Sequence, residues 1–209
     1  MKESCIKKPN STGATGLIGG DYLVVATQRH PEWEISVLIR DAEKAKTVEE
    51  NFPGVRIVQG SLENYGLLER ESKAADVVLS KVHYSLSLME HRNLTLIDFA
   101  NCDHLPAAEA IVSGLSHRDK VGTVIHTSGA KIIAWETESQ PSTWGKFMPR
   151  RYNDLESVEE LTRSPTDANP NPTGFDGILP SWAAHRDVDL AILDGFRKHP
   201  SKVRTAIVC

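Results

Sequence analysis

The feature that most constrains the fold is an alternation of short apolar runs with segments of helix length. Five runs rich in apolar and β-branched residues predict strands, at 35–39, 55–58, 75–79, 121–126 and 203–208. Four segments between them are compatible with helices, at 41–51, 67–73, 107–116 and 187–198. Strands and helices that alternate in this way imply βαβ units and a parallel sheet. Because the strands are apolar along their whole length, we expect helices on both faces of that sheet.

The composition is that of an ordinary folded α/β protein. Of the 209 residues, 40% are hydrophobic and 25% are charged, which excludes collagen-like, coiled-coil and wholly disordered chains. A chain of this length buries roughly 70% of its unfolded surface, so it needs no disulfide or metal to fold. We expect one domain over residues 1–209, with irregular insertions at about 81–102 and 163–182. The second insertion holds four prolines, which exclude a long helix there.

The net charge and the cysteine content limit the kinds of partner and the cellular compartment that we expect for this chain. A net charge of −4 without a cluster of Lys and Arg argues against nucleic acid as a partner. The sequence contains no run of about 20 apolar residues, so we predict no membrane span. The first ten residues are polar, so we expect no secretory signal there. Cys5, Cys102 and Cys209 form no metal-binding motif, so we predict no metal site and reduced thiols in a cytoplasmic protein. The sequence does not indicate an oligomeric state.

A glycine pattern near the start of the chain carries most of the chemistry. Gly13 allows a tight turn, Gly16 lets the backbone approach a pyrophosphate, and Gly19 lets the following helix pack closely on the sheet. The N-terminus of that helix offers free N–H groups and a partial positive charge to phosphates. A glycine-rich turn without a ligand is the alternative. The residues predicted to bind a dinucleotide are Gly13, Ala14, Thr15, Gly16, Leu17, Ile18 and Gly19.

The strand that should precede this turn is poorly marked. Residues 4–11 contain two lysines and Pro9, a composition that is unfavourable for a buried strand. We therefore expect a first strand that is short and irregular, or altered in this gene product.

The end of the second predicted strand bears on the choice of cofactor. An acidic residue there would bind a ribose 2′-hydroxyl and favour NAD, whereas a cation suits the 2′-phosphate of NADP. Arg40 ends the strand and carries a planar, permanently charged guanidinium. We therefore predict NADP(H) in preference to NAD(H). Asp41 acts in the opposite direction, and a solvated Arg40 without a ligand is the alternative.

Seven segments occur in the order found in one protein superfamily. They are TGATGLIGG at 12–20, VLIRDAEKAK at 37–46, ADVVL at 75–79, DHLPAAEAI at 103–111, HTSG at 126–129, YNDLESVEEL at 152–161 and HRDVDLAIL at 185–193. In these segments the chain resembles the short-chain dehydrogenase/reductase superfamily, especially uncharacterised fungal members of its atypical or extended, NAD-dependent epimerase/dehydratase-like branch. The resemblance implies a Rossmann-type, doubly wound parallel sheet. It also implies an NAD(P)-dependent oxidoreductase that acts on a small-molecule carbonyl or alcohol.

The resemblance further implies catalytic roles for two residues. Ser128 stands where the family serine polarises a substrate carbonyl, and Tyr152 stands near the position of the acid/base tyrosine. That tyrosine normally begins Tyr-x-x-x-Lys, but the fourth residue after Tyr152 is Glu156, whose negative charge disfavours a phenolate. The catalytic pair is therefore not intact. A turn-forming Ser128 and a packed structural Tyr152 are the alternatives.

Three more residues are assigned to the cofactor by the same resemblance. Ser61 and Leu62 follow Gly60 where the family usually has Gly-Asp-Leu, whose aspartate contacts adenine, and a serine there still accepts one hydrogen bond. Thr127 immediately precedes Ser128 at the end of a predicted strand.

The sequence leaves three functional hypotheses open: an oxidoreductase, a cofactor-binding redox sensor or regulator without turnover, and an inactive truncated gene product. The family continues beyond the strand predicted at 203–208 into a substrate-binding subdomain, so we expect that subdomain to be largely missing. Residues 81–97 interrupt the family pattern, and their possible codons include splice donor, branch-point and acceptor sequences. We interpret them as a retained intron, with a genuine insertion as the alternative.

Overall fold

A computed structural model of the chain describes residues 8–80, 102–135, 137, 141–147, 151–153, 157 and 183–208. The predicted insertions at 81–102 and 163–182 lie outside the described residues, apart from Cys102. The retained-intron hypothesis for 81–97 therefore stays a prediction, and so does the role of Glu156.

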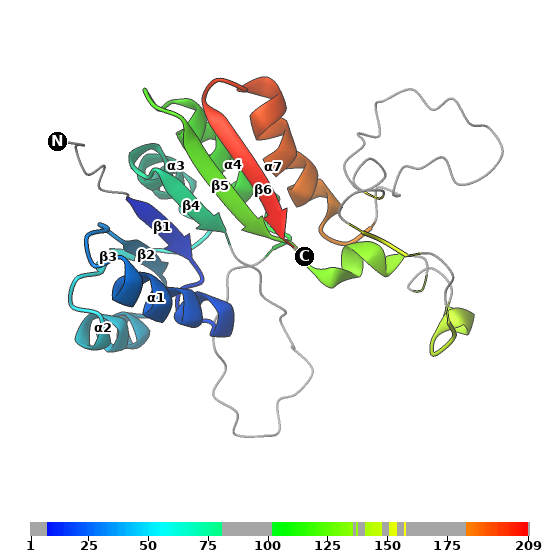
Figure 1. Cartoon of the computed structure of the whole chain (residues 1–209), viewed down its shortest axis with the longest axis horizontal. Coiled ribbons are helices and arrows are strands. Elements are labelled where there is room, and N and C mark those ends of the chain that lie inside the picture. The colour runs from blue at the N-terminus through cyan, green and yellow to red at the C-terminus, as the bar shows by residue number, and fades with distance from the viewer. Residues whose placement is uncertain are drawn as a thin grey trace.

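Six parallel strands form one sheet in the order β3-β2-β1-β4-β5-β6 (Figure 1). The strands are β1 (Pro9–Thr12), β2 (Ser36–Ile39), β3 (Arg56–Gln59), β4 (Val77–Ser80), β5 (Gly122–Thr127) and β6 (Val203–Val208). The helices that connect them are α1 (Leu17–Arg29), α2 (Ala42–Asn51), α3 (Tyr65–Ala74), α4 (Leu105–Ser116) and α7 (Arg186–Lys198). Each predicted strand and helix is present, with its ends within two residues of the prediction. The Rossmann-type, doubly wound sheet is confirmed.

The order of the strands places a ligand site at one edge of the sheet. From β1 the chain winds outward through β2 to β3, then crosses back to β4 and winds in the other direction. In sheets of this kind, ligands bind where the order reverses, beyond the carboxyl ends of the strands. That position lies between β1 and β4, where the glycine turn directly follows β1.

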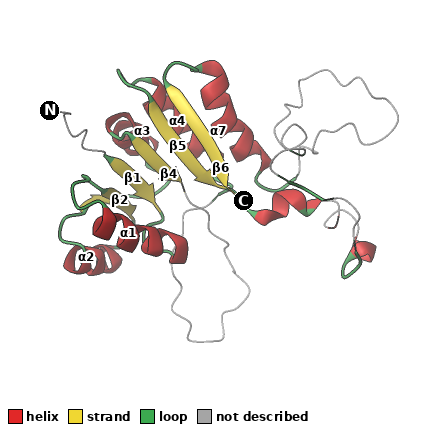
Figure 2. Cartoon of the chain, in the orientation of Figure 1, coloured by secondary structure: helices red, strands yellow, loops and turns green. Residues whose placement is uncertain are grey.

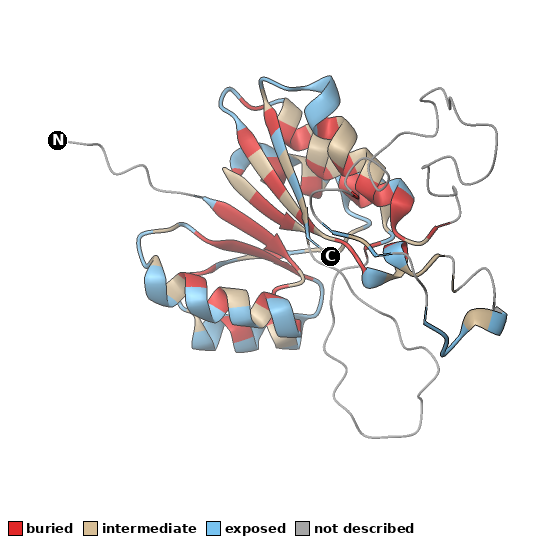
Figure 3. Ribbon diagram, turned by 45° about the vertical axis from the view of Figure 1, so that its right-hand side comes forward, coloured by how far each residue is buried: buried red, intermediate tan, exposed pale blue. Residues whose placement is uncertain are grey.

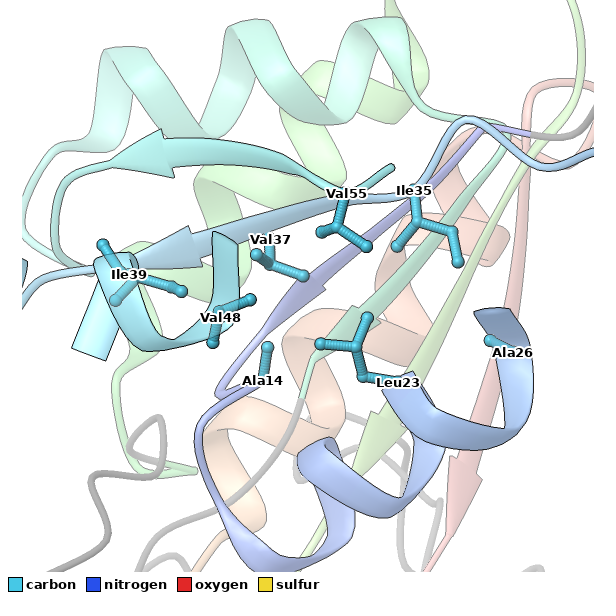
Figure 4. Packing of buried hydrophobic residues seen from close by; sticks show 9 residues of the cluster. Ala14, Leu23, Ala26, Ile35, Val37, Ile39, Val48 and Val55 are labelled. Carbon is cyan, nitrogen blue, oxygen red and sulfur yellow. The ribbon is translucent and has the colours of Figure 1, made fainter. Parts of the chain in front are cut away.

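Helices cover both faces of the sheet, as Figure 2 shows. On one face, Leu23 of α1 and Val48 of α2 pack with Val37 and Ile39 of β2 (Figure 4). A cluster on the other face joins α4, α7, β4, β5 and β6, and its fully buried members are Val78, Ile111, Leu115, Val124, Ile192 and Val203. Buried residues accordingly follow the strands and the helix sides that face them (Figure 3). None of the helices in the described part of the chain is long and apolar enough to cross a membrane.

The first strand is as short as expected, but it is regular. β1 pairs with both neighbours, with Asn10 opposite Ser36 of β2 and opposite Val78 of β4. The amide of Asn10 donates to Ser36 Oγ at 3.0 Å, and both side chains are buried. Pro9 is tolerated because it is the first residue of the strand. A polar segment thus occupies the centre of the sheet, held by its neighbours rather than by apolar packing of its own.

The contact between α3 and α4 generates a matched pair of predictions. A Cβ at Gly114 in α4 would overlap the backbone carbonyl oxygen of Glu69 and lie 2.9 Å from Ser72 Cβ, both in α3. Gly114→Ala should therefore lower the free energy of unfolding by about 1–3 kcal/mol, because the helices must separate. Gly66→Ala in α3, where a Cβ has no neighbour within 4 Å, should be neutral or stabilising by up to about 1 kcal/mol. Urea denaturation measures both, and equal effects would contradict the close contact.

Candidate functional site

The turn between β1 and α1 has the backbone that phosphate binding requires. Gly13 has a φ of +78°, in the left-handed region that favours glycine. The N–H of Gly16 donates to the carbonyl of Gly13 at 3.1 Å and closes the turn. Gly16 is the N-cap of α1 and provides no side-chain acceptor. The N-cap residue itself therefore places no side chain between the start of α1 and a bound anion.

Gly19 is required for the way that α1 leaves the turn. A Cβ at Gly19 would overlap the carbonyl oxygen of Gly13 and lie 2.9 Å from Ala14 Cα. At Gly19 the close approach of α1 is made to the turn that follows β1. The side chains of Leu17 and Ile18 are 66% and 53% exposed, so they lie outside the core.

Arg40 lies at the same edge of the sheet as the glycine turn. Thr12 of β1 is paired with Leu38 of β2, which places the residues just after both strands side by side. The carbonyl of Arg40 accepts a hydrogen bond of 2.7 Å from the side-chain amide of Gln59, and the side chain is exposed. Asp41 is the N-cap of α2, and its Oδ1 accepts from the N–H of Lys44 at 2.9 Å. The carboxylate that could oppose Arg40 thus already serves as a helix cap.

Ser61 and Leu62 follow β3 at this edge of the sheet. The N–H of Ser61 donates to Asn64 Oδ1 at 2.8 Å, just before α3 begins. A hydrogen bond from the Ser61 side chain lowers the pKa of Glu63, and the charges of His104 and Arg40 act in the same direction. Leu62 packs against the apolar cluster under α3, so its side chain has a structural role.

Ser128 belongs to a buried polar cluster after β5. Its hydroxyl donates to Asp189 Oδ2 at 2.8 Å, and its N–H donates to the carbonyl of Val208 at 2.7 Å. Asp189 Oδ1 lies 3.4 Å from His126 Nε2, within ion-pair distance but without hydrogen-bond alignment. The other ring nitrogen of His126 lies 3.4 Å from Ser80 Oγ. Because its proton points to Asp189, Ser128 must rotate its hydroxyl before it can donate to a substrate carbonyl. Thr127 lies just before this cluster and is half-buried.

A second polar cluster joins the beginnings of α4 and α7. His185, the N-cap of α7, has a φ of +69°, which is unusual for a residue other than glycine. Its Nδ1 lies 2.7 Å from Asp103 Oδ1 and 3.0 Å from Cys102 Sγ. A Cβ at Gly129 would overlap the His185 ring, so the chain that follows Ser128 passes directly against the imidazole.

The geometry of this second cluster does not make Cys102 a nucleophile. Burial raises the pKa of the Cys102 thiol to about 12, and the neighbouring Asp103 acts in the same direction. The thiol and the carboxylate also face the same imidazole nitrogen. A nucleophile–base–carboxylate relay needs both ring nitrogens, one for each partner.

A buried cation lies beside the two clusters. Arg186 of α7 is only 1% exposed. Burial lowers the pKa of its guanidinium, whereas the charges of Asp187 and Asp189 raise it.

Tyr152 is hydrogen-bonded to a residue that belongs to neither of the two polar clusters. Its hydroxyl accepts a 3.0 Å hydrogen bond from Trp135 Nε1. Trp135 in turn packs against Ile132 and Ala183. The two predicted catalytic hydroxyls, on Ser128 and Tyr152, are thus held by different partners.

Sequence reasoning missed several residues of these clusters, among them Cys102, Asp103, His126, His185 and Asp189. His185 and Cys102 are 83 positions apart, and Ser128 and Asp189 are 61 positions apart. No local spacing signals such contacts, because they depend on how α7 docks beside β5.

The contact between Ser128 and Asp189 gives a prediction for stability. Ser128→Ala should lower the free energy of unfolding by about 1–3 kcal/mol, because a buried carboxylate loses its donor. The double variant Ser128→Ala/Asp189→Ala should lose less free energy of unfolding than the two single variants lose in total, since the two residues are coupled. Asp187→Ala is the matched control, because Asp187 lies on the same helical turn but is exposed. A strictly additive double-mutant cycle would contradict the interaction.

Comparisons with known proteins give one family match and one sequence relative. Residues 11–101 match the NmrA-like family. Oxidase ucsJ from Acremonium sp. is 31% identical over 205 residues, which cover 97% of this chain and 49% of the relative. The chain thus spans about half the length of the curated relative that it matches.

Two solved structures share the fold at low sequence identity. dTDP-glucose 4,6-dehydratase from Bacillus anthracis, in complex with NAD, has a TM-score of 0.55 and 12% identity, over 96% of this chain and 54% of its own. ChuY, an anaerobilin reductase from Escherichia coli O157:H7, has a TM-score of 0.53 and 14% identity, over 96% and 70%. The expected Rossmann-type fold is confirmed, and over residues 11–101 the chain is similar to the NmrA-like family.

Proposed function

We propose that the chain binds NADP(H) and supplies the cofactor-binding part of an oxidoreductase that acts on a small-molecule carbonyl or alcohol. The observation that carries this proposal is the turn from Gly13 to Gly19. It begins with a left-handed glycine and opens a helix whose N-cap offers no side-chain acceptor. It also lies where the strand order reverses. A pyrophosphate there would meet backbone N–H groups and the positive end of α1.

The surroundings of Arg40 support NADP(H) over NAD(H). The guanidinium follows β2, at the position that the ribose of a bound dinucleotide would approach. Asp41 caps α2, so its carboxylate is held by the N–H of Lys44 rather than directed to a ribose hydroxyl. The dehydratase that shares the fold was solved with NAD, so the choice between cofactors needs a direct test.

The oxidoreductase class is supported by the likeness to oxidase ucsJ. A bound nicotinamide would supply the hydride chemistry, and the protein would position it. In this chain the glycine turn and Arg40 would hold the cofactor. Ser128, Thr127 and Tyr152 are the candidates for the substrate side.

A redox sensor or regulator without turnover is the second candidate, and two contacts favour it. The hydroxyl of Ser128 donates to Asp189, and that of Tyr152 accepts from Trp135. The lysine expected after Tyr152 is replaced by Glu156. NADPH titration followed by NADPH consumption with a panel of aldehydes and ketones separates the candidates. NADPH consumption supports the oxidoreductase, and NADPH binding without consumption supports the sensor. The absence of both binding and consumption indicates an inactive product.

A charge substitution at Gly16 tests the phosphate site. Gly16 has φ −91° and ψ 168°, an extended backbone that other residues adopt, and aspartate and asparagine are both good N-caps. Gly16→Asp should abolish NADPH binding, because a carboxylate would repel the pyrophosphate. Gly16→Asn, which has nearly the same shape without the charge, should retain more affinity. Titration of both folded variants measures the difference, and a Gly16→Asp variant that binds NADPH as tightly as the wild type would contradict a phosphate at this turn.

Arg40→Ala tests the choice of cofactor. A charge-assisted contact with a 2′-phosphate is worth roughly 1.5–3 kcal/mol, so NADPH binding should weaken about ten- to a hundredfold. NADH affinity should barely change, because NADH lacks that phosphate. The control is Lys46→Ala, which removes an exposed positive charge from α2 that pairs with Glu50 at 3.9 Å. Equal losses for both cofactors, or a wild type that prefers NADH, would overturn the NADP(H) assignment.

A further inference from the structure

We propose that Cys102, Asp103 and His185 form a site for a zinc-class divalent cation that ties the beginning of α4 to the beginning of α7. The thiol sulfur, a carboxylate oxygen and an imidazole nitrogen of these residues all lie within 4.8 Å of one another. Cys102 and His185 are 2% and 5% exposed, whereas the Asp103 side chain is 55% exposed. One side of the cluster therefore faces the interior, and the other gives a cation access from solvent.

The chemistry of the three ligands favours zinc over magnesium or calcium. Zinc binds cysteine thiolate, imidazole nitrogen and carboxylate oxygen, and catalytic zinc sites commonly have three protein ligands and a water. Magnesium and calcium prefer ligand sets made of oxygen alone. A thiolate and an imidazole together thus select a borderline-soft metal.

The imidazole is held in place before any metal arrives. The left-handed backbone of His185 fixes the direction of its side chain, and Gly129 leaves space for the ring where a Cβ would overlap it. Strained backbone of this kind is concentrated at ligand clamps and other functional sites. The backbone of His185 and the packing at Gly129 thus fix the position of the imidazole.

The charges around the cluster also suit a cation. Asp103 lies next to the thiol, and the charge of Asp189 acts on Cys102 as well. The positive charge of Arg186 acts on Asp187 and Asp189. A divalent cation bound to Cys102 and Asp103 would offset the repulsion between thiolate and carboxylate and the cost of burying the thiolate.

Binding is balanced in atoms and charge. The Cys102 thiol releases its proton to solvent, and the imidazole proton moves to Nε2, so that Nδ1, Sγ and a carboxylate oxygen each donate an electron pair to the metal. The distances of 2.7 and 3.0 Å from His185 Nδ1 to Asp103 Oδ1 and Cys102 Sγ are hydrogen-bond distances. Ligands of a tetrahedral zinc lie roughly 3.4–3.6 Å apart. Both distances to His185 Nδ1 must therefore lengthen by a fraction of an ångström, the one from Asp103 Oδ1 by movement of a half-exposed side chain and the one from Cys102 Sγ by a small shift of buried side chains.

Cobalt(II) titration of the full chain, reduced and freed of metal with a chelator, tests the site. The background carries Cys5→Ser and Cys209→Ser, so that Cys102 is its remaining thiol. We expect one cobalt per chain, with a thiolate-to-cobalt charge-transfer band and the intense visible bands of tetrahedral cobalt, both abolished by excess zinc. Cobalt binding without the charge-transfer band, or no binding, would overturn the proposal.

Three variants locate the metal, and a fourth is the control. Cys102→Ser should remove the charge-transfer band. Asp103→Asn should weaken cobalt binding by more than about tenfold. Because the Asp103 side chain is half-exposed, this substitution should leave the fold intact, so the weaker binding would not be due to misfolding. His185→Asn should weaken cobalt binding in the same way, and asparagine tolerates the left-handed backbone. His117→Asn, which alters an exposed histidine at the end of α4, should bind cobalt as the background protein does.

Thermal unfolding provides a readout that is independent of spectroscopy. A ligand that binds only the folded state of a protein raises the melting temperature of that protein as the ligand concentration rises. Zinc should therefore raise the melting temperature of the background protein and of His117→Asn, but not that of Asp103→Asn. An equal shift in Asp103→Asn would refute the assignment to this cluster.

Discussion

The pairing of β1 between β2 and β4 is the constraint on which the rest of the structure depends. Its four residues have few apolar side chains to bury, so the strand is held by backbone hydrogen bonds to both neighbours and by the contact between Asn10 and Ser36. The glycine turn begins at the next residue, so the direction of β1 sets where α1 starts. The phosphate site is therefore positioned by a strand that the rest of the sheet holds in place.

The sequence predicted the fold well because most of its elements carry their own signal. Strand 203–208 is rich in apolar and β-branched residues and follows a helix of suitable length, and the structure places it at those residues. β1 carries no such signal, since its stability comes from its neighbours and its polar side chains resemble a loop. The glycine turn was predictable because Gly13 and Gly19 contact each other within seven residues of sequence. His185 was not, because its partners at 102 and 103 approach it only after α4 and α7 have docked.

Two kinds of interaction meet at the carboxyl edge of the sheet. On the side of β1 and β2, the site consists of backbone N–H groups, a helix terminus and Arg40. On the side of β5 and α7, it consists of buried side chains, where Asp189, His126 and Arg186 are each at most 3% exposed. Backbone groups tolerate substitution of most neighbouring side chains. A buried polar cluster does not tolerate substitution, because the loss of one side chain leaves another buried polar group without its hydrogen-bond or ion-pair partner.

The central position of β1 also has a consequence for how the chain folds. β1 can pair early with β2, because Asn10 and Ser36 are 26 residues apart, but Asn10 and its partner Val78 in β4 are 68 residues apart. Closing so long a loop costs entropy before any contact between the strands compensates for it, which makes sheets of this kind slow to form. During synthesis on the ribosome, the half made of β1, β2 and β3 emerges with one edge of its first strand unpaired. That edge remains able to pair with other extended chains until residues 77–79 have been made and have reached it.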